Sequence, residues 1–187
     1  MSDLQVINGP LELWWAATGT SMPAVDGDPG SSSFTKIGSS GDDNYTEDGV
    51  VIITSQTVEQ FTPLGRTAPT KAFRTNEDLT VQVTLADLSL AQVRLALNQN
   101  AVTTNADDKE INLNRGPDVN YIALLIRGTS KSPEAAGFNL QFELFKVYEG
   151  ASQELSFVKG EPAGVLLEFH ALDDLTNGVG SLRNETS

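Results

Sequence analysis

Apolar and polar residues alternate strictly over residues 79–85, where the sequence reads LTVQVTL. Successive side chains of a β-strand point to opposite faces of a sheet, so the four apolar residues share one face. A helix has a period near 3.6 residues and could not gather them on one side. This pattern predicts a strand with one face in a core and a polar, uncharged opposite face formed by Thr80, Gln82 and Thr84.

Most other periodic segments also favour strands. Residues 119–126 are apolar on both faces, as in a central strand. The segment 138–148 alternates until Phe145, where the apolar face switches and a bulge is expected. Residues 50–61 are β-branched but carry Thr, Ser and Gln on both faces, so part of this segment should project or line a wet surface. Further strands are predicted over residues 11–17, 34–37, 155–159 and 165–172.

One helix interrupts these strands, over about residues 90–98. Ser89 and Gln92 have the spacing of an N-terminal capping box, and Leu88 with Val93 could form a hydrophobic staple around it. The 3.6-residue period predicts that three side chains of this helix face inward: Leu90, Val93 and Leu97.

These elements predict a mainly β fold, an antiparallel β-sandwich or partly closed barrel with one flanking α-helix. A chain of 187 residues is long enough for one domain with a full core. We expect that domain to span residues 1–175, with a long acidic loop or arm around residues 18–62. Residues 176–187 lack periodicity and are expected to form a polar tail.

Charge and composition exclude several classes of function. The chain has 25 acidic and 12 basic residues, a formal net charge of −13, so a surface that grips nucleic-acid phosphates is not expected. It has no cysteine and a single histidine, which excludes thiolate nucleophiles and histidine-rich metal sites. The start of the sequence shows no secretory signal and no apolar run is long enough to span a membrane, so we expect a soluble protein made in a cytoplasm.

The candidate chemical sites in the sequence are weak. Glu168 and His170 share a strand face and could form an acid–base couple, although such pairs are more often surface pairs. An EF-hand-like start at residues 26–30 has Gly30 where a third ligand belongs and Ile37 where the closing Glu would fall. We therefore expect no catalytic residue, metal or cofactor, and interpret the acidic stretch as a solvated loop, with a loose, irregular cation site as the alternative.

Trp14 and Trp15 should point to opposite faces of the first strand. One of them can lie in the core while the other reaches a neighbouring molecule or solvent. Two readings stay open, a pair of core aromatics or an interface anchor.

A series of short segments follows in a fixed order along the first half of the chain: WAATGTSMP at 15–23, FTKIG at 34–38, EDGVVII at 47–53, PTKAFRTNE at 69–77, VQVTL at 81–85 and ADLSL at 86–90. In order and spacing, this series resembles the major tail proteins, or tail tube proteins, of long-tailed bacteriophages with non-contractile tails. The resemblance covers about residues 11–98.

The resemblance implies a β-sandwich subunit, six of which form a ring, with rings stacking into the hollow tube of the virion tail. It implies contacts with further copies of the chain, with the tape measure protein and with tail terminator and tail-tip proteins, while DNA passes without specific binding. The subunit would be made in the host bacterial cytoplasm. No enzymatic activity and no membrane contact are expected.

Two sets of residues are candidates for the contacts of such a subunit. The long segment 39–61 suits an arm that reaches the next ring, with the candidates Asp42, Asp43, Tyr45, Glu47, Asp48, Gln56 and Phe61. Polar or acidic strand faces suit a lumen that must not hold DNA, with the candidates Thr80, Gln82, Thr84, Asn139, Gln141 and Glu143. The alternative function is a carbohydrate- or receptor-binding β-sandwich, such as a capsid decoration protein, that uses Trp14, Trp15 or Tyr45 on an exposed loop.

Overall fold

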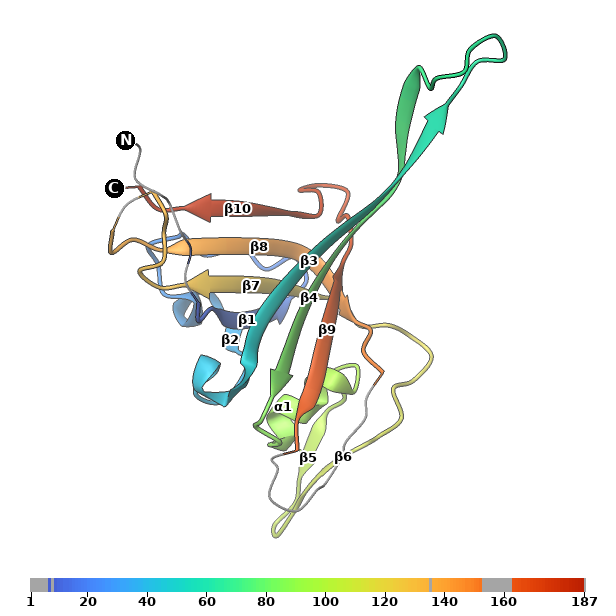
Figure 1. The fold of residues 1–187 in the computed structure, drawn as a ribbon. Coiled ribbons are helices and arrows are strands. Elements are labelled where there is room, and N and C mark those ends of the chain that lie inside the picture. Colours follow the sequence, from blue (N-terminus) through green and yellow to red (C-terminus); the bar gives the residue numbers. More distant parts are fainter. Residues whose placement is uncertain (1–6, 8, 135, 153–162, 187) are drawn as a thin grey trace.

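A computed structural model describes residues 7, 9–134, 136–152 and 163–186 of the chain. The described residues are mainly β, with one α-helix and two short 3-10 helices (Figure 1). In chain order the elements are β1 (Glu12–Ala17), η1 (Pro29–Ser32), β2 (Thr35–Lys36), η2 (Gly41–Asn44), β3 (Tyr45–Phe61), β4 (Lys71–Leu85), α1 (Leu90–Ala96), β5 (Val102–Thr104), β6 (Lys109–Ile111), β7 (Ile122–Gly128), β8 (Leu140–Glu149), β9 (Val165–Ala171) and β10 (Gly180–Asn184).

The main sheet has the strand order β2-β1-β7-β8-β9-β4-β3, and every described pairing is antiparallel. Strand β8 forks it, because its first half also pairs with β10 while its last three residues pair with β9. The sheet therefore folds into two layers, β2-β1-β7-β8-β10 and β9-β4-β3 (Figure 1). This confirms the predicted antiparallel fold with a flanking helix.

The core lies between the two layers and follows the alternation of the strands. Val81, Val83 and Leu85 of β4 are buried, as their period predicts. They belong to one cluster with apolar residues of β1, β7, β8, β9 and α1. Strand β7 is buried on both faces, which confirms its prediction as a central strand. Burial of this set removes apolar surface from water and is the main stabilising term of the fold.

The predicted irregularity near Phe145 is present. The pairing of β8 with β7 shifts by one residue between Leu124↔Leu144 and Ile122↔Val147. Because of this bulge, Leu144 and Val147 both face the main core although an odd number of positions separates them.

The helix is found where it was predicted, but the details of its packing differ. The side chain of Ser89 makes no capping hydrogen bond. Instead, Oδ1 of Asp87 accepts a hydrogen bond from the Ser89 amide at 2.9 Å. The three residues expected to face inward, Leu90, Val93 and Leu97, are only half-buried. The buried residues of α1 are Gln92, Leu95 and Ala96. Gln92 is buried because its Oε1 accepts a hydrogen bond from the buried amide of Gly38 at 3.0 Å.

Trp14 and Trp15 lie on opposite faces of β1, as predicted. Trp15 packs against the main core, and Trp14 packs against a second buried cluster beneath residues 18–34. Both side chains are half-buried within the chain. This second cluster comprises Ala16, Phe34, Ala123 and Leu125.

Two parts of the predicted domain plan are wrong. Residues 180–184 are not an irregular tail, because they form β10 along β8. Residues 18–44 do not project as an arm, because they carry two 3-10 helices and β2 and pack on the body. The strand predicted over 155–159 lies outside the described residues.

Candidate functional site

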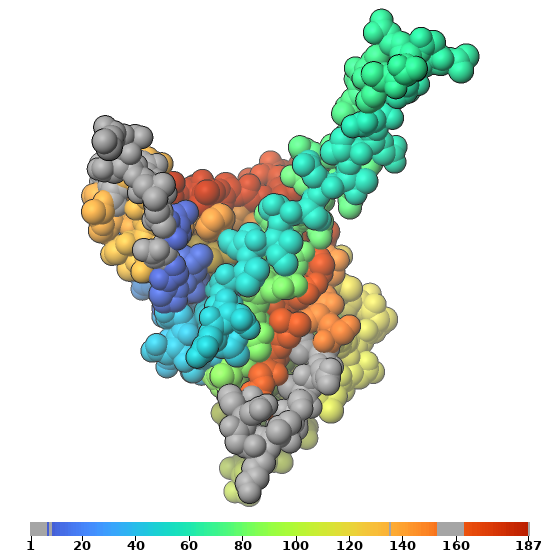
Figure 2. Space-filling view, viewed as in Figure 1, coloured from blue at the N-terminus to red at the C-terminus, as the bar shows by residue number. Residues whose placement is uncertain are grey.

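The most prominent surface feature of the molecule is a long hairpin formed by β3 and β4, which leaves the body as a narrow projection (Figure 2). Every residue from 53 to 77 is exposed except the half-buried Pro63. We call residues 54–78 the arm. Its eight-residue outgoing strand, residues 54–61, extends roughly 25 Å at the usual rise per residue of a strand.

The hairpin ladder is the main support of the arm backbone, and the Thr75 hydroxyl adds a hydrogen bond to the Thr57 carbonyl at 3.3 Å. The pairing continues from Thr54↔Leu79 to Phe61↔Lys71, with one irregularity after Thr57. At the turn, the Thr70 amide donates to the Phe61 carbonyl at 2.9 Å. Two-stranded hairpins are at best marginally stable in water by themselves, so this segment would gain stability from a partner surface.

The arm also exposes large apolar side chains. The exposed fractions are 48% for Val58, 54% for Phe61, 107% for Leu64 and 47% for Phe73. The strand register places Phe61 and Phe73 as diagonal neighbours on one face of the hairpin and Val58 on the other. Apolar side chains that cluster on an exposed surface commonly mark an interaction site. The expectation that part of residues 50–61 projects is therefore confirmed. Sequence reasoning missed the returning strand over residues 71–78, because its polar and charged residues hide the period of two.

The candidate arm residues divide between two places. Gln56 and Phe61 lie on the projecting part, where Oε1 of Gln56 accepts a hydrogen bond from Nε of Arg74 at 2.9 Å. The other candidates lie in η2 and the first residues of β3, on the body: Asp42, Asp43, Tyr45, Glu47 and Asp48. The prediction of an acidic arm is therefore wrong, because the acidic residues of this segment do not lie on the part that projects.

Tyr45 is an internal residue of this foot. Its hydroxyl donates to the Ile37 carbonyl at 2.8 Å and accepts from the Leu13 amide at 3.0 Å. Burial raises the pKa of the Tyr45 hydroxyl well above its usual range. The tyrosine therefore fastens the start of β3 to the neighbouring strands β1 and β2.

The first set of candidate lumen residues lies on the outward face of the β3-β4-β9 layer. Thr80 is buried, with only 6% of its surface exposed, and Gln82 and Thr84 are half-buried. Their register places Thr80 opposite His170 and Gln82 opposite Glu168 on β9. On β3, the exposed side chains of Val51 and Ile53 continue the same face, since these residues pair with Gln82 and Thr80.

Hydrogen bonds tie the Glu168–His170 pair into this face. Oε1 of Glu168 is 2.8 Å from Nε2 of His170, and Nε2 of Gln82 donates to Oε2 of Glu168 at 2.7 Å. Thr80 Oγ1 lies 3.3 Å from Nδ1 of His170, and the Tyr148 ring stacks on the imidazole at 5.2 Å between centroids. Both imidazole nitrogens thus have protein partners, an arrangement that favours a structural role on the sheet surface.

The second set of candidate lumen residues is internal, contrary to expectation. Gln141 and Glu143 have no exposed surface and Asn139 is half-buried. They point to the outer face of β8, but residues 18–34 and β10 cover that face. Nε2 of Gln141 donates to the Pro23 carbonyl at 2.9 Å and to Oε1 of Glu143 at 2.6 Å. Asn139 donates from Nδ2 to the Val25 carbonyl at 3.0 Å.

Charged partners complete this buried network. Arg127 hydrogen-bonds Gln141 and donates to the carbonyls of Ala24 and Val25 at 3.1 and 2.6 Å. Burial lowers the pKa of the Arg127 guanidinium. On the other side, Arg183 Nε lies 3.3 Å from Oε2 of Glu143, which also accepts from the Ser181 hydroxyl at 2.9 Å. The network fastens the covering loop and β10 to the sheet.

Within the described ranges, no group of three or more His, Cys, Asp or Glu side chains is arranged to hold a metal ion. No described helix is both long and apolar enough to cross a membrane. The three aromatics proposed for glycan or receptor contact, Trp14, Trp15 and Tyr45, are all half-buried in the body.

Comparison with known proteins finds no family model that matches the chain and no significantly similar curated protein.

Proposed function

We propose that this chain is a self-assembling structural protein whose copies form six-membered rings that stack into the hollow tail tube of a long-tailed bacteriophage. The main observation behind the proposal is the arm, which exposes Phe61, Leu64 and Phe73 and projects away from the rest of the described chain. The ordered segments of the first half of the chain resemble tail tube proteins, and this resemblance is the reason to propose a tube as the form of assembly.

An arm of this shape suits repeated contacts between copies. It leaves the body in one direction and would meet a different surface on the next copy, which makes the contact head-to-tail. Head-to-tail contacts generate closed rings where the rotation closes and open helical stacks where it does not. A tube of stacked rings contains both kinds of contact.

The outward face of β4 and β9 suits the channel of such a tube. Residues 80–84 and 166–170 contain no Lys or Arg, so this face has no cation to hold a phosphate backbone. DNA and the tape measure protein would pass along it, and tail terminator and tail-tip proteins would close the ends. The protein would act in the virion, without catalysis and without a cofactor.

Electron microscopy with an arm variant tests the proposal. In the variant, residues 57–76 are replaced by Asn-Gly, which forms a tight hairpin turn and keeps the Gln56↔Glu77 pair. We expect rings or tubes from the concentrated wild-type protein and only monomers from the variant. The far-ultraviolet circular dichroism spectrum of the variant should still show a folded β protein.

Two results would contradict the proposal. One is a wild-type protein that stays monomeric at every concentration and salt tested. The other is a variant that forms the same tubes as the wild type, because the arm would then be dispensable for assembly.

A further inference from the structure

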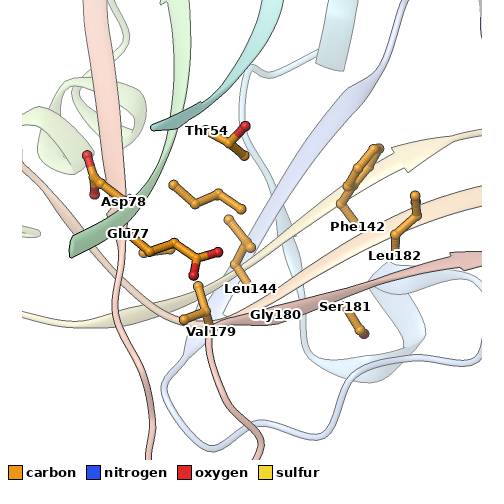
Figure 3. A pocket seen from close by; sticks show the side chains of 11 residues that line it. Thr54, Glu77, Asp78, Phe142, Leu144, Val179, Gly180, Ser181 and Leu182 are labelled. Atoms are coloured by element: carbon orange, nitrogen blue, oxygen red, sulfur yellow. The ribbon is translucent and has the colours of Figure 1, made fainter. Parts of the chain in front are cut away.

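An apolar groove opens at the root of the arm, between β10 and the first residues of the projecting hairpin (Figure 3). Its volume is about 350 Å³. Phe142 and Leu144 of β8 form its floor, and Val179 and Leu182 form the wall on the β10 side. Glu77 and Asp78 lie at the arm side of the groove. Oε2 of Glu77 pairs with Nη1 of Arg74 in the same chain at 3.1 Å, so Asp78 supplies the acidic charge of this rim.

The groove exists because β8 pairs with two strands that then diverge. Strand β10 follows the first half of β8, and β9 follows its end. Between them, Leu144 of β8 is buried and Phe142 stays half-buried on the inner face of the sheet. Leu182 is 51% exposed and Val179 is 37% exposed, although both side chains line an apolar surface. A pocket of this size and lining is typical of a binding site.

The tip of the arm has the complementary character. Residues 57–76 hold three of the 12 basic residues of the chain, Arg66, Lys71 and Arg74, but only one of its 25 acidic residues. Apolar Phe61, Leu64 and Phe73 lie among these cations. Arg74 already pairs with Glu77, so Arg66 and Lys71 are the cations that the tip offers to a partner. The tip is thus apolar and basic on a strongly acidic molecule, whereas the groove is apolar with Asp78 on its rim.

A chain cannot fill its own groove with its own tip. The groove lies at the root of the arm, and the paired strands extend away from it for roughly 25 Å before they turn. The occupant with the matching chemistry is therefore the tip of a second copy.

We propose that the groove of each copy receives the arm tip of another copy, with Leu64 and its apolar neighbours against Phe142 and Leu182. In this contact, Arg66 and Lys71 of the tip lie near Asp78 of the receiving copy. This inference rests on the proposed assembly and adds the receiving surface to it. Because tip and groove are different surfaces, each copy has one of each to offer, and the contact propagates from copy to copy.

Cysteine cross-linking tests the contact, since the chain has no cysteine of its own. A tagged Leu64→Cys protein is mixed with untagged Leu182→Cys protein under assembly conditions and oxidised mildly. The matched control replaces the partner with Leu113→Cys, whose site is 76% exposed and lies away from the groove. We expect the mixed disulfide to form at least about ten times more with Leu182→Cys, and its yield to fall as salt rises.

Other outcomes would overturn the inference, and they separate it from the proposed function. Tubes without a mixed disulfide above the Leu113→Cys control would refute the groove contact and leave the tail-tube proposal standing. Disulfides between two Leu182→Cys chains would show that the groove faces its own copy in a symmetric contact. Absence of both tubes and cross-links would count against both proposals.

A second variant excludes an effect of the cysteines themselves. Leu182→Asp places a charge in the groove on a half-exposed strand residue, and Leu182→Met keeps the groove apolar. We expect the Asp variant to stay folded and monomeric and the Met variant to assemble. Equal assembly of the two variants would overturn the proposed contact.

Discussion

At the scale of single residues, polar side chains fasten the foot of β3 and the loop before η2 to neighbouring elements. Tyr45 joins β3 to β1 and to the end of β2 through one hydroxyl group. Asp87 joins the start of α1 to the loop before η2, because it accepts hydrogen bonds from Ser89 and from the amide and hydroxyl of Ser39. Such contacts supply hydrogen-bond partners to backbone groups that lie outside the sheet pairing.

Tyr45→Phe should destabilise the chain, because the substitution leaves the Leu13 amide and the Ile37 carbonyl without the hydroxyl that each contacts. A buried hydrogen-bonding group without a partner costs about 1–3 kcal/mol. Urea unfolding at neutral pH measures the change. The matched control is Tyr121→Phe, at a side chain that is 44% exposed, and equal losses for the two variants would contradict this role of Tyr45.

The role of Asp87 predicts a pH dependence. Its hydrogen bonds, first of all the one from the Ser39 hydroxyl, lower the pKa of this carboxyl below its usual value. A carboxyl with a lowered pKa in the folded state stabilises the fold above its unfolded pKa, roughly 3.9, and loses this contribution as the pH falls through the folded pKa.

We therefore expect Asp87→Asn to be less stable than the wild type at pH 7, by less than about 1 kcal/mol because solvent screens this site. The difference should shrink as the pH falls below about 4. Urea midpoints of the two proteins between pH 3 and 7 measure it. A difference that stays constant over this range would contradict the role of the ionised carboxylate.

At the scale of elements, β10 and the arm are both extended segments, but they differ in what they contact. Strand β10 has a half-exposed, polar sequence but covers the free edge of β8 and contributes Ser181 and Arg183 to the buried Glu143. The arm has β-branched strands but contacts nothing in the described body beyond its root.

Removal of residues 176–187 should therefore destabilise the body. It uncovers one edge of β8 and takes away the cation and hydroxyl that contact Glu143. Loss of a fully buried charged partner costs about 3–5 kcal/mol, and we expect a smaller loss here because the Arg183 side chain is 52% exposed. Urea unfolding measures the loss, and removal of residues 186–187 alone is the control, expected to change little. A shortened chain as stable as the wild type would contradict a structural role for β10.

At the scale of the whole molecule, charge is distributed unevenly between the body and the projecting arm. The body carries nearly all of the acidic residues, whereas the tip of the arm is basic. Copies of an acidic body repel one another, and the basic tip offers one attractive contact between them. In the proposed assembly, the same negative charge keeps DNA from adhering to the tube.

A test of the channel face adds cations to it. Val51→Lys with Ile53→Lys places two lysines beside Gln82 and Thr80, at side chains that are 41% and 42% exposed, so the fold should be kept. We expect tubes of this variant to retain DNA in a salt-dependent manner, because each lysine near a phosphate releases counterions.

The matched control is Val51→Gln with Ile53→Gln, which is polar without charge. Filter binding of labelled DNA to both kinds of tube, at low and high salt, measures retention. Equal DNA retention by the lysine and glutamine variants would place the channel on another face of the subunit.

The sequence by itself determined the mainly β fold, the helix α1, the β4 core face and the bulge near Phe145. Each of these depends on residues close in sequence, where side-chain period reports directly which face is buried. Even the segment that projects could be predicted in part, from the polar residues on both faces of residues 50–61.

Only the tertiary structure decided what covers each polar face. The alternation of Gln141 and Glu143 predicts a polar face of β8, but whether it meets solvent depends on residues 18–34 and on β10, which are distant in sequence. The same holds for β10, whose partner strand supplies the pairing that its own residues do not predict, and for the direction of the arm. Local period determines which side of a strand is polar, whereas contacts between distant segments determine whether that side is a surface, an interior or a groove.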